Sequence, residues 1–317
     1  MHTPRSTLAA WAGHAGAALE PLYEAHKRFV LGCAVLHADA TPVAMLDPGA
    51  GKTRRAYVWA YARGELDARA GVIYEFCLGR GSQYPVAFLG GAQGPPQAQR
   101  CEHPPWSGTL VCDGYGGYDP VLDRRVYPQR IAAACVAHAR RKFDELAKSG
   151  ASAVAVDALQ RIGRIYHVEG QLRGMDAAQR LAAREQLTRP LWKELHVWLQ
   201  LERARVADGG TTAAAIDYSL NSWTALSRHL EDGAVPIDNN FLERQIKPWA
   251  MGRKAWLFCG SELAGQRAAV VMSLVQSAKL NGHEPWAYLR DVLARLPTHL
   301  NSRIDELLPH CWRPAEA

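Results

Sequence analysis

The chain has 317 residues, 48% of them hydrophobic and 21% charged, so it can bury a sizeable core and is not a disordered segment. Lysine and arginine exceed aspartate and glutamate by six charges, a mild excess that suits a polyanionic partner without establishing one. The seven cysteines lack Cys-x-x-Cys spacing and no apolar run reaches the ~18 residues of a membrane span, which predicts a reduced, cytoplasmic protein without a zinc knuckle.

The first half of the chain has the pattern of an α/β domain. Residues 6–30 have helical spacing, and Pro21 divides them or starts a second helix. Short apolar and β-branched runs then predict five strands, over residues 29–36, 56–61, 71–76, 108–112 and 131–136. Turn and loop residues fill 47–53 and 90–107. A helix is expected from Ala139 to Lys148.

The second half is mainly helical. Residues 150–230 are rich in Ala, Leu, Gln and Arg at helical spacing, which predicts an all-helical insertion. The stretch Asp238–Arg244 then begins a helix, because Asp or Asn before an apolar-periodic run accepts an otherwise unpaired backbone N–H. Further helices are expected over 261–279 and 284–296. The predicted division is an N-terminal helical segment (1–30), a two-part core (31–149 and 231–296), the insertion (150–230) and a C-terminal tail (297–317).

Three carboxylates occupy positions from which they can meet. Asp39 is expected at the end of the first strand and Asp113 at the end of the fourth, and adjacent strand ends line the crevice where open sheets bind ligands. Glu243 falls in the first turn of the helix that starts near Asn240. Converging carboxylates suit Mg²⁺, and two ions ~3.5–4 Å apart serve phosphoryl transfer. Strand-end aspartates also cap turns, however, and Asp113-Gly114 is a turn dipeptide.

Longer sequence blocks distinguish a metal site from carboxylates that only cap turns. In chain order they are His37–Val43, Tyr57–Trp59, Asp113–Tyr118, Ala137–Phe143, Asp238–Arg244, Gly252–Phe258, Ser277–Gly282 and Tyr288–Arg290. In composition and order they resemble the transposases of the insertion sequence 66 family, which are DDE-type enzymes with a ribonuclease-H-like core. The resemblance extends from residue 6 to residue 312 and therefore covers nearly the whole chain.

The resemblance implies a fold, a site and an activity. The fold would be α/β, a ribonuclease-H-like mixed sheet flanked by helices, with residues 150–230 as the helical insertion. Asp39, Asp113 and Glu243 would be the catalytic triad and would bind two Mg²⁺ ions, for which Mn²⁺ can substitute. The activity would be Mg²⁺-dependent cleavage and strand transfer at insertion-sequence ends, on the double-stranded DNA of those ends and of the target. A homo-oligomer assembled on DNA and accessory proteins of the element are further expected partners, and no membrane is involved.

Two departures from the family pattern motivate an alternative. The family usually has Glu directly after the first Asp, and this chain has Ala40, which cannot supply that charge. Full-length members also carry an N-terminal region with DNA-binding and coiled-coil elements, and this chain starts at the catalytic part. The alternative is a catalytically impaired DNA-binding remnant or truncated copy. A third hypothesis, a ribonuclease-H-like repair nuclease, predicts cleavage without preference for transposon ends.

Basic and polar side chains near the carboxylates are further candidates. Because Arg and Lys supply most phosphate contacts, the predicted DNA-binding residues are Arg140, Arg141, Lys142, Arg244, Arg253 and Lys254. A solvated helix face is the alternative for the first three. Asn239 and Asn240 are expected to cap the helix and to support the metal ligands rather than to bind metal. His138 is expected to be a hydrogen-bonded structural residue that supports the site, with contact to the scissile phosphate as the alternative. Trp256 and Phe258 are expected in the hydrophobic core.

Overall fold

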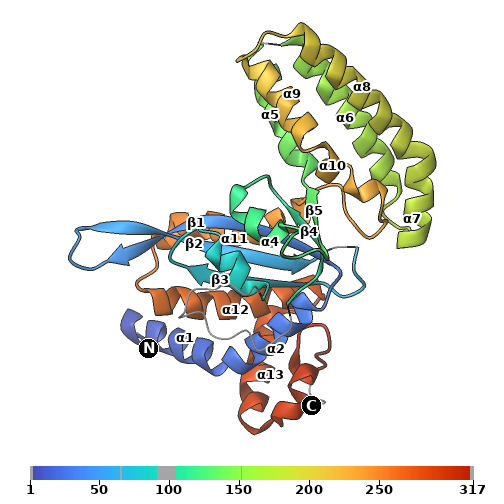
Figure 1. Ribbon diagram of the computed structural model, residues 1–317. Coiled ribbons are helices and arrows are strands. Elements are labelled where there is room, and N and C mark those ends of the chain that lie inside the picture. The colour runs from blue at the N-terminus through green and yellow to red at the C-terminus, as the bar shows by residue number, and fades with distance from the viewer. Residues whose placement is uncertain (1–2, 65, 91–104, 151, 315–317) are drawn as a thin grey trace. The chain divides into compact units, whose positions relative to one another are not determined.

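The computed structural model describes residues 3–64, 66–90, 105–150 and 152–314. Five strands form one sheet in the order β3-β2-β1-β4-β5 (Figure 1). The strands are β1 (Val35–Asp47), β2 (Lys52–Arg63), β3 (Gly71–Cys77), β4 (Gly108–Cys112) and β5 (Arg130–Ala134). Together with the many helices this confirms the predicted α/β class with an all-helical insertion. Most of the loop predicted over 90–107 lies outside the described residues.

The helices account for most of the remaining chain. They are α1 (Arg5–Ala18), α2 (Glu20–Leu31), α3 (Gln83–Phe88), α4 (Asp119–Leu122), α5 (Val136–Lys148), α6 (Ala153–Gln171), α7 (Ala177–Ala183), α8 (Arg189–Arg205), α9 (Thr211–Asn221), α10 (Trp223–Leu226), α11 (Asn240–Trp256), α12 (Glu262–Leu280) and α13 (Pro285–Arg295). Short helical turns are η1 (Gly116–Tyr118), η2 (Arg184–Thr188), η3 (Arg228–Leu230), η4 (Leu296–Thr298) and η5 (Asn301–Leu307). Among the described residues, none of these helices has both the length and the apolar character needed to cross a membrane.

The chain folds as two compact units. Unit 1 comprises Met1–Gly108, Gly116–Arg130 and Phe241–Ala317. Unit 2 comprises Thr109–Tyr115 and Ile131–Asn240, and so contains the helices predicted as an insertion. In unit 2 these helices pack around a buried apolar cluster that includes Phe143, Ile165, Trp192, Leu199 and Ile216.

In unit 1, the two faces of the β1–β2–β3 meander pack on different elements. On one face, Val43 and Met45 of β1 join a buried cluster with Phe241 and Ile246 of α11. On the other face, the ring of Trp59 lies 5.6 Å from that of Tyr118, and the ring of Tyr61 lies 3.7 Å from that of Phe88, as centroid distances. Because side chains alternate along a strand, each β1 residue can be assigned to one of these faces.

Helix α12 closes the outer edge of β3. The Ser277 hydroxyl accepts a hydrogen bond from the backbone N–H of Val72 at 3.0 Å, and Ser273 does the same for Tyr74 at 2.8 Å. A side chain at Gly265 would place its Cβ 2.5 Å from the Phe76 ring, so glycine permits this close approach. The edge N–H groups are thereby paired rather than open to another strand.

The first predicted strand is wrong at its start and too short at its end. Phe29, Val30 and Leu31 belong to α2, and β1 runs from Val35 to Asp47, so Asp39 lies inside the strand and not at its end. Phe29 is held in the helix by packing: its carbonyl accepts a hydrogen bond from Arg63 Nη1 at 2.9 Å, and the guanidinium lies 4.3 Å from its ring centroid. The other four strands occur where they were expected: β4 has the predicted bounds, and β2, β3 and β5 have shifted ends.

One buried histidine makes the stability of unit 1 depend on pH. His26 is fully buried, and its Nε2 lies 3.0 Å from the Val72 carbonyl oxygen and 2.8 Å from the Ser277 hydroxyl. Burial lowers the pKa of His26 to about 4. The unfolded chain binds this proton below about pH 6.5 and the folded chain only below about pH 4, so folding stability is lost as pH falls through that window.

We expect His26→Gln to remove this pH dependence. The free energy of unfolding of the wild type should fall by up to ~3 kcal/mol between neutral pH and pH 4 from this group, and the variant should show a correspondingly smaller fall. Denaturant titrations at several pH values measure the difference. His14→Gln, at an exposed position of α1, is the matched control. Equal pH slopes for His26→Gln and wild type would contradict the assignment.

Candidate functional site

Asp39 projects from the face of the sheet that α11 covers. It lies directly opposite Ala60 of β2, and Ala60 belongs to the apolar cluster packed against α11. Its carboxylate is half-buried, and Oδ1 accepts a hydrogen bond from the backbone N–H of Ala40 at 2.7 Å. The same face therefore presents a fixed carboxylate to the helix above it.

Glu243 is brought to that face by the course of α11. The ring of Phe241, at the helix start, lies 5.6 Å from the ring of His37, which is two residues before Asp39 on the same face. Near the helix end, Arg253 Nη1 donates a hydrogen bond to the Pro42 carbonyl at 2.9 Å. Helix α11 thus runs along β1 in the strand's own direction. Unit 1 places Asp39 and Glu243 on one face, at the same end of this helix–strand pair.

The predicted capping stretch starts α11. Asp238 Oδ1 accepts the backbone N–H of Asn240 at 3.0 Å, and Oδ2 accepts from the Asn240 side-chain amide at 2.7 Å. The Tyr166 hydroxyl of α6 donates to the same carboxylate at 2.9 Å. Glu243 follows in the first turn, near the positive end of the helix dipole. Sequence reasoning identified the cap but missed Tyr166, because nothing local marks a contact with a residue 72 positions earlier.

Contacts along α11 hold the helix on the sheet. Leu242 and Ile246 are buried in the shared apolar cluster. Pro248 lies inside the helix and lacks the N–H that would continue the helical hydrogen-bond ladder. The Tyr74 hydroxyl of β3 donates to the Gln245 carbonyl one turn earlier. The glutamate therefore sits on a helix that is anchored on both sides of its proline.

Ala40 points away from Asp39. It lies directly opposite Trp59 of β2, whose side chain belongs to the face that carries Tyr118. A glutamate at position 40 would project from this second face, because neighbouring strand residues point to opposite sides. The departure from the family pattern at Ala40 therefore removes no carboxylate from the face of Asp39 and Glu243.

We expect Ala40→Glu to leave metal affinity unchanged. The new carboxylate would lie beside the fully buried Trp59, and we expect it to lower the free energy of unfolding by ~1–3 kcal/mol through desolvation. Calorimetric titration with Mn²⁺ and denaturant unfolding measure the two effects. Ala44→Glu, on the same face nearer the end of β1, is the control. A gain of about tenfold or more in Mn²⁺ affinity for Ala40→Glu alone would show that position 40 contributes to the site.

Asp113 belongs to unit 2 and directly follows β4, as predicted. Its Oδ1 accepts the backbone N–H of Tyr115 at 3.2 Å, so it also caps the turn that the dipeptide indicated. A Cβ placed on Gly114 would lie 3.2 Å from the Tyr218 hydroxyl, which shows how closely α9 approaches this turn. Burial first, and then the neighbouring Cys135 and Asp113, raise the pKa of Tyr218. This phenol therefore remains a neutral hydrogen-bonding group beside the carboxylate.

The predicted supporting residues gather near the end of β5. The backbone N–H of Cys135 donates to the Cys112 carbonyl at 3.2 Å, which sets the start of α5 beside the end of β4. The backbone N–H of Asn239 donates to Cys135 Sγ at 3.2 Å, and Asn239 is fully buried. His138 is half-buried in the first turn of α5. Within unit 2, Asp113, His138 and Asn239 therefore lie near the ends of β4 and β5.

The predicted DNA-binding residues are largely on the surface. Arg140, Arg141 and Lys142 are exposed on α5, and Arg244 and Lys254 are exposed on α11. The Lys142 ammonium lies 4.5 Å from the ring centroid of Tyr218, so it is held near the Asp113 turn. DNA binding by these residues stays a prediction.

The expectation that Trp256 and Phe258 are core residues is wrong, since they are 38% and 41% exposed.

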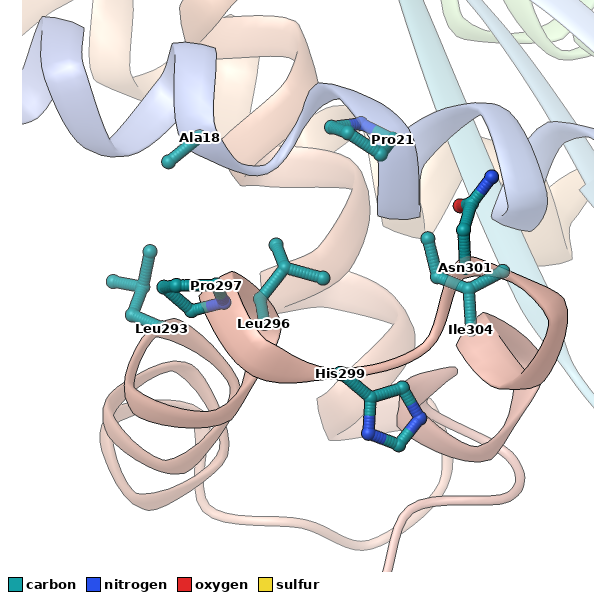
Figure 2. A pocket seen from close by; sticks show the side chains of 8 residues that line it. All are labelled: Ala18, Pro21, Leu293, Leu296, Pro297, His299, Asn301 and Ile304. Atoms are coloured by element: carbon teal, nitrogen blue, oxygen red, sulfur yellow. The ribbon is translucent and has the colours of Figure 1, made fainter.

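A hollow of about 320 Å³ in unit 1 is not part of this site. Figure 2 shows Ala18 and Pro21 on one side of it, facing Leu293, Leu296 and Pro297. None of the predicted catalytic, metal-binding or DNA-binding residues lines it.

Comparison with known proteins gives matches over nearly the whole chain. The model of the family "Transposase IS66 family" matches residues 1–267, and that of the "IS66 C-terminal element" matches residues 273–310. Three similar proteins of Sinorhizobium fredii (strain NBRC 101917 / NGR234), the uncharacterized proteins y4hP, y4qI and y4jD, are 33%, 34% and 32% identical over 98%, 99% and 98% of this chain. The chain spans 57%, 57% and 60% of their lengths. The chain belongs to the IS66 family of transposases.

Proposed function

We propose that the chain is the catalytic part of a transposase that cleaves DNA at insertion-sequence ends and joins it to target DNA. The observation that carries the proposal is the common placement of Asp39 and Glu243, one on β1 and one in the first turn of the helix packed on the same face. Asp113 is proposed as their third partner. It directly follows β4, and β4 is next to β1 in the order of the sheet.

The donor set fits divalent magnesium. All three proposed ligands are carboxylates, which are the hard oxygen donors that Mg²⁺ prefers, and all three are half-buried. Asp39, Asp113 and Glu243 would hold a pair of Mg²⁺ ions, or Mn²⁺ in their place. When bound, such ions supply electrostatic stabilisation of the attacking and leaving oxygens in phosphoryl transfer.

The chain's own residues would place the DNA. Basic side chains on α5 and α11 would hold the phosphate backbone, because Arg and Lys contacts give most of the affinity for DNA. Water would attack the phosphodiester at the end of the element, breaking the phosphorus–oxygen bond and releasing a 3′-hydroxyl. That hydroxyl would then attack a target phosphodiester and displace its leaving oxygen. Both steps need positioning and charge but no covalent intermediate on the protein.

A strand-transfer assay tests this proposal. Purified full chain, end duplex and Mg²⁺ or Mn²⁺ should yield end-specific nicks followed by joined products. A DNA-binding remnant would bind the duplex and give no product with either metal. A repair nuclease would cleave end and scrambled duplexes equally. Binding without nicking, or nicking without end preference, would each refute the transposase assignment.

A further inference from the structure

Three consecutive large apolar side chains are exposed at the end of α11, the first on its last residue and the other two directly after it. Trp256, Leu257 and Phe258 are 38%, 65% and 41% exposed. Exposed runs of this kind are rare on soluble proteins and mark surfaces that meet a partner. We therefore expect a binding partner to cover these three side chains. The charge of the neighbouring residues indicates what kind of partner it is.

The segment is held rigidly. The backbone N–H of Cys259 donates to the Ala44 carbonyl at 2.8 Å, and the Leu46 N–H donates to the Cys259 carbonyl at 2.8 Å, so the chain lies along β1. Leu257 has a φ of 64°, in the left-handed region that residues other than glycine rarely adopt. Residues held in such conformations concentrate at ligand clamps and switch regions. This segment is therefore a fixed surface.

The lack of a side chain at Gly252 makes room for the indole of Trp256. A Cβ on Gly252 would lie 2.6 Å from Trp256 Nε1, so a larger residue would displace the indole. The Trp256 ring also meets the ring of Trp249 edge-on, at 6.3 Å between centroids. One part of the indole thus packs on α11 and the other part faces solvent.

The surface beside these side chains is basic. Lys52 and Arg54 of β2 are exposed, and Arg54 lies directly opposite Met45, which forms a bridge to Cys259 on its other side. Two strand spacings put the backbones of Arg54 and Cys259 about 10 Å apart. Lys254 adds an exposed cation from α11, and Asp47, opposite Lys52, is an acidic neighbour. Figure 1 shows the β1–β2 hairpin projecting from the rest of unit 1.

We infer that this apolar-and-basic surface, made of Lys52, Arg54, Lys254, Trp256, Leu257 and Phe258, binds double-stranded DNA and opens a base step. The cations hold phosphates, and the apolar side chains press between bases that have lost stacking, as wedge residues of DNA-bending proteins do. The inference rests on the proposed function, because that function supplies the DNA. Charge complementarity selects this occupant over a second copy of the chain, which is itself basic.

The geometry also sets where the wedge acts. Glu243 and Trp256 are 13 positions apart on α11, which is about 20 Å along the helix axis. At 3.4 Å per nucleotide this distance corresponds to about six base pairs. For DNA that lies along α11, the opened step is therefore about six base pairs from the phosphodiester that Glu243 serves.

The double variant Trp256→Ala/Phe258→Ala tests the wedge. We expect it to weaken binding of a fluorescein-labelled end duplex by about tenfold or more, measured without divalent metal. Phe258→Ala alone should show part of the loss while leaving the packing of Trp256 on α11 intact. Trp286→Ala, which removes a 65% exposed indole on α13 of the same unit, is the matched control and should bind as wild type. Aminopurine placed at the predicted step should brighten with wild type and stay dark with the double variant.

Lys52→Gln/Arg54→Gln tests the cations. It should reduce the slope of log Kd against log salt by about two, and Arg124→Gln/Arg125→Gln, an exposed pair elsewhere in unit 1, should change it less.

Unchanged binding and an unchanged aminopurine signal in the wedge variant would overturn the inference. So would loss of self-association in sedimentation with DNA binding intact, which would make the surface an interface between copies. Because binding is measured without metal, a wild type that fails to nick refutes the proposed function and leaves this result standing.

Discussion

Replacing Asp113 with Asn is expected to reduce Mg²⁺-dependent nicking of end DNA by on the order of a thousandfold while leaving DNA binding nearly unchanged. The reason is charge: an amide keeps the shape of the side chain but supplies a neutral, much weaker ligand. Asn also retains a side-chain oxygen, which can still accept the backbone N–H of Tyr115, so the turn after β4 should persist. The loss should therefore appear in the rate of cleavage and not in the unfolding midpoint.

The control for Asp113→Asn is Asp119→Asn. It removes an equally short carboxylate six positions later, at an exposed site at the start of α4. Nicking and gel-shift assays on the same end duplex, with both variants and wild type, separate cleavage from binding. Nicking by Asp113→Asn at the wild-type rate would remove Asp113 from the mechanism.

Replacing Arg184 with Ala is expected to destabilise the helices of unit 2 by ~3–5 kcal/mol. Arg184 and Glu169 form a buried ion pair at 2.7 Å, with side chains 1% and 8% exposed. The same guanidinium donates to the carbonyls of His229, Asp232 and Val235 at 2.7, 3.1 and 2.9 Å. Alanine would leave a buried carboxylate and three carbonyls without this partner. The segment that carries these three carbonyls leads directly to Asp238, which caps α11.

Hydrogen exchange measures this effect locally. Peptides of α6 and α8 should exchange about 10²–10⁴ times faster in Arg184→Ala, because local opening becomes less costly by the same free energy. Arg173→Ala, an exposed arginine after α6, should leave exchange unchanged. A destabilisation below ~1 kcal/mol would mean that the ion pair contributes no more than a surface pair.

Local signals predicted most of the fold. Four of five strands and the start of α11 follow from β-branched runs and from the cap at Asp238, because these signals act within a few residues. The run from Phe29 to Leu36 was assigned wrongly because a short apolar run suits a strand and a buried helix equally. Its first three residues end α2, where the Phe29 carbonyl accepts a hydrogen bond from Arg63, 34 positions away, a contact that local pattern cannot reveal.

The residues proposed for the candidate site could be named from the sequence, but their arrangement could not be predicted from it. The three carboxylates follow from the family motifs, yet Asp39 lies mid-strand because β1 pairs with β2 as far as Asp47. The exposure of Trp256 and Phe258 was missed, because an apolar run does not show whether other elements cover it. Tyr166 and Tyr218 were missed since their contacts to Asp238 and to the Asp113 turn arise only from tertiary packing.

A crystal structure of the protein soaked with Mn²⁺ tests the central claim most directly, because anomalous scattering locates the ions without ambiguity. The proposed site predicts two ions ~3.5–4 Å apart, bound by oxygens of Asp39, Asp113 and Glu243. Carboxylates more than ~10 Å apart in the metal-soaked crystal, or ions bound elsewhere, would contradict the proposed site.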